Sequence, residues 1–351
     1  NTLKKQSKKN INEYLSVTDR NPLLLQGDAL SVLKLIPDSS VNCVITSPPY
    51  WLQREYESGG LGQERKKEDY IASLLLIFSE IKRVLTNDGS FWLNINDTYN
   101  KKSLSGIPWR VAIAMMDEQD WILRNDIIWN KLKGGMDSSK DRLNNIHENI
   151  FHFVKNAKYY YNIDAIRTTS RKASIKNGAV VSATGITGVN YKRRIELSTT
   201  LSDEEKNLAF TALENILEEI AKNKISDFRM VIRGQHRITH SDSEKISGRA
   251  RELRDKGFYF LKYHPKGSKP SDVWEIPPED AQKRGAHFAP YPEEVCIIPI
   301  LSTCPPNGIV LDPFVGTGTT TAVACKLGYR SIGIDISKSY LNIAEKRVKN
   351  T

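Results

Sequence analysis

The chain has 351 residues, of which 39% are hydrophobic and 26% are charged. These proportions are typical of a soluble globular protein, and no run approaches the ~18 apolar residues that a membrane-spanning helix needs. Residues 1–10 are polar and lysine-rich, unlike a signal peptide, and the four scattered cysteines form no CxxC pair. We therefore expect a reducing, cytoplasmic setting and exclude secreted and membrane proteins.

The net charge of +10 is unevenly distributed along the chain. Residues 166–272 hold 21 basic and 13 acidic side chains, and residues 1–20 hold five basic and two acidic ones. A positive field of this kind suits a polyanion such as DNA. A solvated basic surface would give the same composition, so charge alone leaves both interpretations open.

Strand-like and helical segments alternate in two parts of the chain, residues 23–165 and 273–351. Strands are predicted at Val41–Thr46, Ser90–Asn96, Ile309–Leu311 and Ser331–Ile334, and helices at Asp69–Leu85, Thr319–Leu327 and Lys338–Val348. Asn87-Asp88-Gly89 predicts a turn before the second strand. Alternation of this type favours an α/β domain with a mostly parallel sheet.

The middle of the chain, residues 166–272, has a different pattern. Ser202 and Glu205 have the spacing of a capping box, and they precede a helix expected over Asp203–Lys224. Its predicted apolar stripe consists of Leu208, Leu213, Ile216, Leu217 and Ile220. A second, more basic helix is expected over Ser243–Lys256. We thus predict a basic N-terminal arm (1–22), an α/β half (23–165), a mostly helical insertion (166–272) and a second α/β half (273–351).

The first candidate site is Thr46-Ser47-Pro48-Pro49-Tyr50-Trp51, directly after a predicted strand. Ligands of open α/β sheets bind at the carboxyl ends of strands. Two consecutive prolines remove two N–H donors, which leaves carbonyls and the Ser47 hydroxyl as acceptors for an amino group. Tyr50 and Trp51 could stack on a planar base. The alternative is a rigid turn whose aromatic rings pack in the core.

The second candidate site is Leu311–Thr320, with the sequence LDPFVGTGTT. It reads as a strand, a glycine-rich turn and a helix, the layout of a nucleotide-type site. Asp335 ends the next strand, where an acid can bind two ribose hydroxyls. No Gly-Lys-Ser/Thr follows, and Thr321 replaces the third glycine of a dinucleotide fingerprint. Asp312 at the start of the turn suits a ligand with an ammonium or sulfonium group.

Together, TSPPYW, DPFVGTGTT and GIDIS resemble the signature motifs of DNA amino-methyltransferases, which use S-adenosylmethionine. The order of these motifs resembles the permuted class called beta. Further similar segments are Gln26-Gly27-Asp28, Phe91–Leu93, Ser271–Ile276 and His287–Pro292. The resemblance implies a Rossmann-like methyltransferase fold with circularly permuted motifs and a DNA-recognition region inserted between its halves.

The resemblance also implies a role for individual residues. Ser47 and the Pro48 carbonyl, supported by Pro49, would accept hydrogen bonds from the target amine, and Tyr50 would stack on the flipped base. The implied cofactor-binding residues are Asp28 (adenine), Asp335 (ribose) and, around the methionine end, Phe288, Pro290, Asp312, Pro313, Phe314, Gly316, Gly318 and Thr319. The candidate DNA-contacting residues are Trp51, Arg54, Arg233, Arg237, Arg249, Arg251 and Arg254. The residues Trp129, Lys131, Arg142 and Glu148 resemble the family's pattern near the target pocket.

Serine at position 47 favours methylation of the exocyclic N4 of cytosine within this family. We therefore expect a site-specific cytosine-N4 DNA methyltransferase of a restriction–modification system. The partners considered are double-stranded DNA with a flipped base, a cognate restriction endonuclease and a second copy of the chain, and no metal site is expected. The alternatives are N6-adenine methylation, a non-catalytic DNA-binding protein with this fold, and a nicotinamide-dependent oxidoreductase. Asp312 and the missing third glycine argue against the last.

Overall fold

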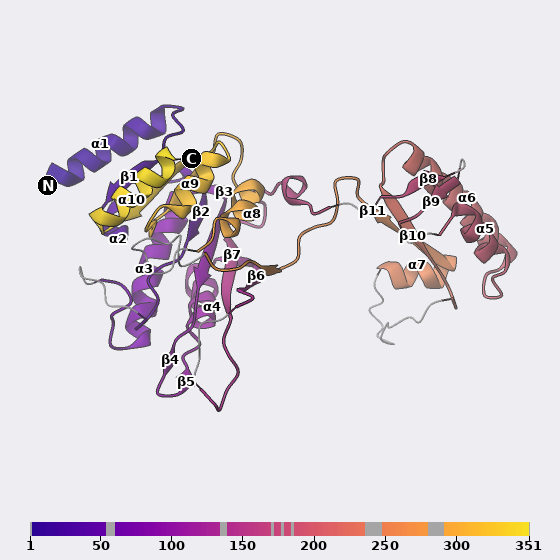
Figure 1. Ribbon diagram of the computed structural model, residues 1–351, viewed down its shortest axis with the longest axis horizontal. Coiled ribbons are helices and arrows are strands. Elements are labelled where there is room, and N and C mark those ends of the chain that lie inside the picture. Colours follow the sequence, from indigo (N-terminus) through magenta and orange to yellow (C-terminus); the bar gives the residue numbers. More distant parts are fainter. Residues whose placement is uncertain are drawn as a thin grey trace. The chain divides into compact units, whose positions relative to one another are not determined.

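The computed structural model describes residues 2–53, 60–133, 139–169, 172–176, 179–183, 186–235, 248–279 and 291–350. The chain divides into two compact units (Figure 1). Residues 1–165 and 271–351 form the first, here called the sheet unit, and residues 166–270 form the second, here called the inserted unit.

An eight-stranded sheet with the order β1-β14-β13-β2-β3-β7-β6-β12 forms the centre of the sheet unit. The strands are β1 Leu23–Gln26, β2 Val41–Thr46, β3 Leu85–Ile95, β6 Ile122–Asn130, β7 His147–Val154, β12 Val273–Glu275, β13 Ile309–Asp312 and β14 Arg330–Asp335. All neighbours are parallel except the two pairs that β7 makes with β3 and β6. The carboxyl ends of seven strands and the amino end of β7 therefore meet at one edge, here called the carboxyl edge.

Helices cover both faces of the sheet, as expected for a largely parallel arrangement. One face packs against α1 Thr2–Ser16, α2 Ala29–Leu33, α3 Lys67–Val84 and α4 Ile107–Gln119. The other packs against α8 Glu294–Thr303 and α9 Thr319–Lys326, and α10 Lys338–Lys349 contacts α9 and β1. Side chains of β2 alternate accordingly, with Val44 on the first face and Cys43 and Ile45 on the second.

Two expectations for the sheet unit are corrected. The predicted turn at Asn87–Gly89 lies within β3, which begins at Leu85 directly after α3, and it coincides with a register shift between Val41–Leu85 and Cys43–Ser90. Most of the N-terminal arm is the helix α1, which packs on the core. Ile11 is fully buried, and the Tyr14 hydroxyl accepts a hydrogen bond from the Ser331 amide at 2.9 Å. The lysine-rich N-terminal segment therefore also anchors β14, through the uncharged side chain of Tyr14.

The inserted unit has its own core, formed by helices and two small sheets. Its helices are α5 Gly188–Glu196, α6 Asp203–Ala221 and α7 Gly248–Lys256, and its antiparallel strand pairs are β8 Ser174–Lys176 with β9 Ala179–Val181 and β10 Asp227–Ile232 with β11 Phe258–Tyr263. The capping box of Ser202 and Glu205 is confirmed. Leu208, predicted to lie in the apolar stripe, is instead 59% exposed. The insertion is thus mixed rather than mostly helical.

The remaining elements of the described chain are short. They are the strands β4 Tyr99–Asn100 and β5 Ser103–Leu104, which pair with each other, and the 3-10 helix η1 Ile163–Ile166. No helix in the described ranges combines the length and apolar character that crossing a membrane requires.

Candidate active site

The two sequence motifs meet at the carboxyl edge of the sheet. Thr46, the last residue of β2, donates a hydrogen bond from its hydroxyl to the Asp312 carboxylate at the end of β13, at 2.6 Å and 266 positions apart in sequence. The strand order explains this contact, since β13 lies between β2 and β14. The same arrangement places Asp335, which ends β14, at this edge. Three segments with predicted functions are therefore neighbours.

A connected group of polar side chains, here called the polar cluster, lies beside the TSPPYW loop. The Ser47 hydroxyl donates to the Tyr50 hydroxyl at 3.0 Å, which in turn donates to Oε2 of Glu148 at 2.7 Å. Asn94 Nδ2 donates to the Tyr50 hydroxyl at 3.0 Å and to Glu148 Oε2 at 2.9 Å. Lys131 Nζ forms a salt bridge with Glu148 Oε1. The cluster thus joins β2, β3, β6 and β7 at one point.

Most of the polar cluster is removed from solvent. The Glu148 side chain is 6% exposed and that of Lys131 is 24% exposed. Burial, together with the negative charge of Glu148, raises the pKa of Tyr50 well above its usual value, so the phenol keeps its hydrogen at neutral pH. Asn94 is also buried, and nothing in the described ranges donates to its Oδ1. A buried acceptor left free in this way is available to a ligand.

The sequence prediction missed Asn94. The only available signal was an amide side chain within the apolar strand sequence FWLNI. Glu148 and Lys131 were identified by resemblance, but the hydrogen bond between Tyr50 and Glu148 was not predicted. It arises because β7 is antiparallel and brings its amino end to the carboxyl edge.

Hydrogen bonds to residues outside the loop anchor the TSPPYW segment after β2. The Tyr70 hydroxyl donates to the Pro49 carbonyl at 2.8 Å, which fixes the second proline against α3. The Trp51 indole donates to the Glu64 carbonyl at 2.8 Å and is 3% exposed. The expectation that Trp51 contacts DNA is therefore corrected: its ring packs in the core and supports the loop.

Asp312 is buried, with a side chain surrounded by hydrogen-bond donors. Its Oδ1 accepts from the Thr46 hydroxyl and the Phe314 amide, and its Oδ2 accepts from the hydroxyls of Tyr291 and Thr320. The residue is 1% exposed, and burial raises its pKa above the usual value. Four donors occupy the roughly four acceptor positions of a carboxylate. A ligand ammonium could contact Asp312 only by displacing one of these donors.

The glycine-rich turn connects β13 to α9. Gly316 and Gly318 both have positive φ angles, of 50° and 85°, which glycine adopts without strain. The Gly316 amide donates to Asp335 Oδ2 at 2.9 Å, and the Ser337 amide donates to Asp335 Oδ1 at 2.8 Å. Each oxygen of this half-buried carboxylate keeps a further acceptor position, which fits two vicinal hydroxyls.

Other predicted cofactor residues lie around this turn. Asp28 is exposed, caps α2 through its side chain, and follows Gly27, whose amide donates to the Asp335 carbonyl at 2.9 Å. Pro313 is buried and Phe314 is half-buried against the first core. The Thr319 hydroxyl is buried and accepts a hydrogen bond from Arg347 at 3.1 Å, so this side chain faces α10. Phe288 and Pro290 lie outside the described residues.

The arginines predicted to contact DNA differ in their surroundings within the inserted unit. The guanidinium of Arg233 binds both carboxylate oxygens of Glu205 at 2.7 and 2.9 Å and the Thr200 carbonyl at 2.7 Å. This network makes Arg233 a bridge between α6 and β10. The exposed residues Arg249, Arg251 and Arg254 lie on α7, where Arg254 pairs with Asp255, and Arg54 and Arg237 lie outside the described ranges.

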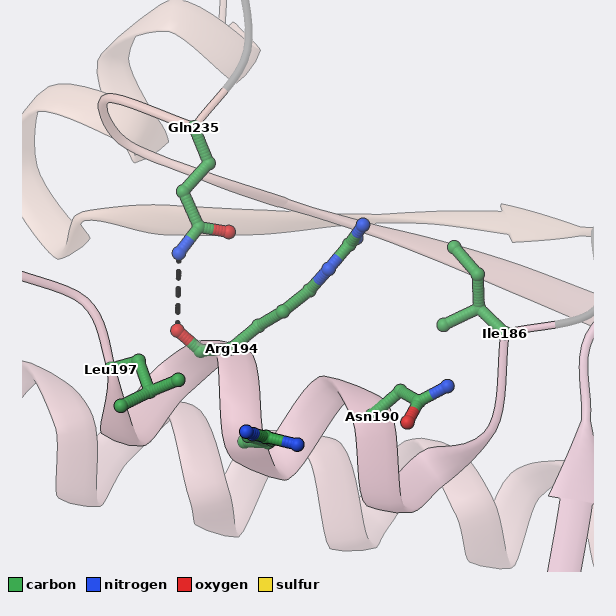
Figure 2. A pocket seen from close by; sticks show the side chains of 6 residues that line it. Ile186, Asn190, Arg194, Leu197 and Gln235 are labelled. Carbon is green, nitrogen blue, oxygen red and sulfur yellow. Dashed lines mark hydrogen bonds between the residues drawn. The ribbon is translucent and has the colours of Figure 1, made fainter.

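A hollow of about 350 Å³ lies between α5 and the end of β10 (Figure 2). It is lined by Ile186, Asn190, Arg193, Arg194, Leu197 and Gln235. Gln235 donates from its amide to the Arg194 carbonyl at 3.0 Å, which ties the turn after β10 to α5. No carboxylate is among these six residues, so the hollow is basic. The sequence prediction did not single out any of them.

The family model for DNA methylases matches residues 41–346 of the chain. The chain belongs to the DNA methylase family. Among its relatives, the type II methyltransferase M.SfiI of Streptomyces fimbriatus is 32% identical, with 91% of this chain and 89% of the relative covered. M.Cfr9I of Citrobacter freundii is 29% identical, with 93% of this chain and 87% of the relative covered.

A solved structure supports the fold of this DNA methylase. The structure described as PvuII DNA methyltransferase (cytosine-N4-specific) superposes with a TM-score of 0.56 at 18% identity, covering 93% of this chain and 86% of that one. The Rossmann-like methyltransferase fold is therefore confirmed. S-adenosylmethionine is the methyl donor of this DNA methylase. The remaining acceptor positions of Asp335 fit the two hydroxyls of its ribose.

Proposed function

We propose that this DNA methylase methylates the exocyclic N4 of cytosine at a specific site in double-stranded DNA, as the modification enzyme of a restriction–modification system. The observation that carries the proposal is Ser47, whose hydroxyl lies at the carboxyl end of β2 within the polar cluster. A neutral hydroxyl there, rather than a carboxylate, is the variant of the motif that favours cytosine. The relatives are named type II methyltransferases, which supports the proposed role in a restriction–modification system.

The proposed chemistry uses the chain to orient a poor nucleophile. S-adenosylmethionine supplies an electrophilic methyl group. The Ser47 hydroxyl and the Pro48 carbonyl accept hydrogen bonds from the two N–H groups of the amine. This orientation turns the nitrogen lone pair out of conjugation with the ring. Holding two reacting groups in the correct orientation lowers the activation free energy by up to about 7–11 kcal/mol. Prolines suit this purpose because they offer carbonyls without competing N–H donors.

Tyr50 is proposed to stack on the target base after the base leaves the helical stack. The bonds from its hydroxyl to Glu148 and from Asn94 hold the phenol ring in one orientation. Asp335 would bind the ribose of the cofactor and Asp28 its adenine amine. Pairing with a cognate endonuclease and association with a second copy of the chain remain predictions.

Nucleoside mass spectrometry of DNA treated with the purified protein tests the proposal. We expect N4-methylcytosine as the dominant methylated nucleoside. A dominant N6-methyladenine product would favour the second candidate, because the same two acceptors can hold the N6 amine of adenine. DNA binding without any methylated product would instead support a non-catalytic protein that retains the fold.

We also propose that the basic hollow of the inserted unit contacts DNA. Arginine forms two hydrogen bonds with the guanine edge, and asparagine or glutamine does so with adenine, so Arg193, Arg194, Asn190 and Gln235 offer the side chains that read bases. Arginines also bind phosphates. Arg233 is a poorer candidate, since Glu205 already binds its guanidinium.

Replacing both Arg193 and Arg194 by alanine is expected to weaken DNA binding and to flatten its salt dependence. Each lost phosphate contact reduces the slope of log K against log salt by about 0.9. Fluorescence anisotropy at several salt concentrations measures both quantities. Lys192→Ala is the matched control on the same helix, because Lys192 pairs with Glu214 at 3.2 Å. Equal slopes for the double variant and the control would place the DNA contacts elsewhere.

A further inference from the structure

We propose that the proton released by the methylated amine leaves the active site along a hydrogen-bond chain from Ser47 through Tyr50 to Glu148. The proposal rests on the proposed function in requiring that the target be an exocyclic amine. Glu148 is the final proton acceptor, and Lys131 and Asn94 hold it in place.

The chain of bonds has the direction that proton release requires. Ser47 donates its hydrogen to the Tyr50 oxygen at 3.0 Å, and Tyr50 donates its own hydrogen to Glu148 Oε2 at 2.7 Å. The Ser47 hydrogen therefore points toward Tyr50, and the Tyr50 hydrogen points out of the loop toward the Glu148 carboxylate. The Ser47 oxygen keeps a lone pair for the N–H of the target amine.

The proton transfer balances. The amine nitrogen bonds to the methyl carbon, the carbon–sulfur bond breaks with its electron pair left on sulfur, and the nitrogen then carries one surplus proton. That proton passes to Ser47 as the Ser47 hydrogen passes to Tyr50 and the Tyr50 hydrogen passes to Glu148. Ser47 and Tyr50 end with the same atoms as before, and Glu148 becomes a neutral carboxylic acid.

Other members of the polar cluster are less suited to accept the proton. Asn94 donates through its Nδ2, and an amide is too weak a base for this role. Tyr50 transmits the proton and does not keep it, because burial raises the pKa of its phenol, which therefore already carries a hydrogen. Asp312 lies on the other side of Thr46 and is already bound by four donors.

The alternative role for the same bonds is only to hold the Tyr50 ring, and a charge-matched pair of variants separates the two roles. Glu148→Gln keeps the shape of the side chain and one acceptor oxygen but cannot take a proton. Combining it with Lys131→Met removes the salt bridge as a pair, so no unpaired buried charge remains. Thermal unfolding and the dissociation constants for DNA and cofactor show whether the site is intact.

We expect Glu148→Gln/Lys131→Met to stay folded and to bind both ligands near wild-type affinity. Its single-turnover methylation rate should nevertheless fall by about 100- to 10,000-fold, the usual contribution of a proton acceptor. Glu148→Asp keeps a carboxylate and should recover part of the rate. Tyr50→Phe keeps the ring but removes the hydroxyl hydrogen in the middle of the path. In the double variant Tyr50→Phe/Glu148→Gln, the reduction in rate should be smaller than the product of the two single reductions, because both changes break the same path.

Two results would overturn the proton path. One is a paired variant within about threefold of the wild-type rate, and the other is fully multiplicative losses for Tyr50→Phe and Glu148→Gln. A wild-type protein that forms no methylated amine would instead refute the proposed function. The two failures are therefore distinguishable in the same set of measurements.

Discussion

Ser47→Ala is expected to raise the activation free energy of methyl transfer by about 2–4 kcal/mol, which slows the reaction roughly 30- to 1,000-fold. This is the usual loss on deleting one positioned hydrogen-bonding group. The variant loses the acceptor that orients the amine. It also loses the first member of the proposed proton path, while Pro48 and the Tyr50 ring remain. DNA and cofactor affinities should change little, because Ser47 contributes one hydroxyl to a site held by many other bonds.

Single-turnover transfer of a labelled methyl group, with protein in excess over DNA, measures this loss without interference from product release. Ser73→Ala is the control, since among the described residues the Ser73 hydroxyl bonds only within α3, to the Asp69 carbonyl at 2.9 Å. A full rate in Ser47→Ala would remove this hydroxyl from the mechanism.

Gly318→Ala is expected to destabilise the sheet unit as well as to impair cofactor binding. Gly318 has φ +85°, and an added Cβ would lie 2.6 Å from the Cβ and 2.9 Å from the Cα of Ala344 in α10. A left-handed conformation costs a non-glycine residue about 1–2 kcal/mol, and overpacking adds about 1–3 kcal/mol. The larger Gly318→Val change would cost more stability. We therefore expect every substitution of Gly318 by a larger residue to lower the free energy of unfolding.

Thermal unfolding with and without S-adenosylmethionine tests this expectation. A domain of this size loses about 2–4 °C in Tm for each kcal/mol of stability. Gly248→Ala is the control, because no atom of the described residues lies within 4 Å of its added Cβ and its φ is not positive. An unchanged Tm in Gly318→Ala would show that α10 can move away from the turn at no cost.

The sequence was sufficient to predict the alternating elements and the carboxyl ends that hold Ser47, Asp312 and Asp335. These predictions depend on local periodicity and on one general rule for parallel sheets. The rule cannot indicate that one strand, β7, runs in the opposite direction. The link between Tyr50 and Glu148 depends on that reversal, so it required the structure.

Individual side chains were harder to assign than the elements that hold them. Trp51 has a large ring that suits stacking on a base, yet its indole finds a carbonyl partner in Glu64 and becomes buried. Arg233 lies in the basic insertion, yet its charge is bound by Glu205, 28 positions earlier. Whether an aromatic ring or a guanidinium is available to a ligand depends on tertiary neighbours, which composition does not show.

The strand order also governs how the protein can be made. Among the described strands, β1 pairs only with β14, and β2 has β13 on one side, so these two strands wait for partners from residues 309–335. A nascent chain that ends before residue 309 therefore has an incomplete sheet and no glycine turn. Such late, non-local pairing slows folding and exposes strand edges during synthesis. The carboxyl edge is therefore complete only after residues 309–335 have been synthesised, and slow translation of this stretch would prolong an aggregation-prone stage.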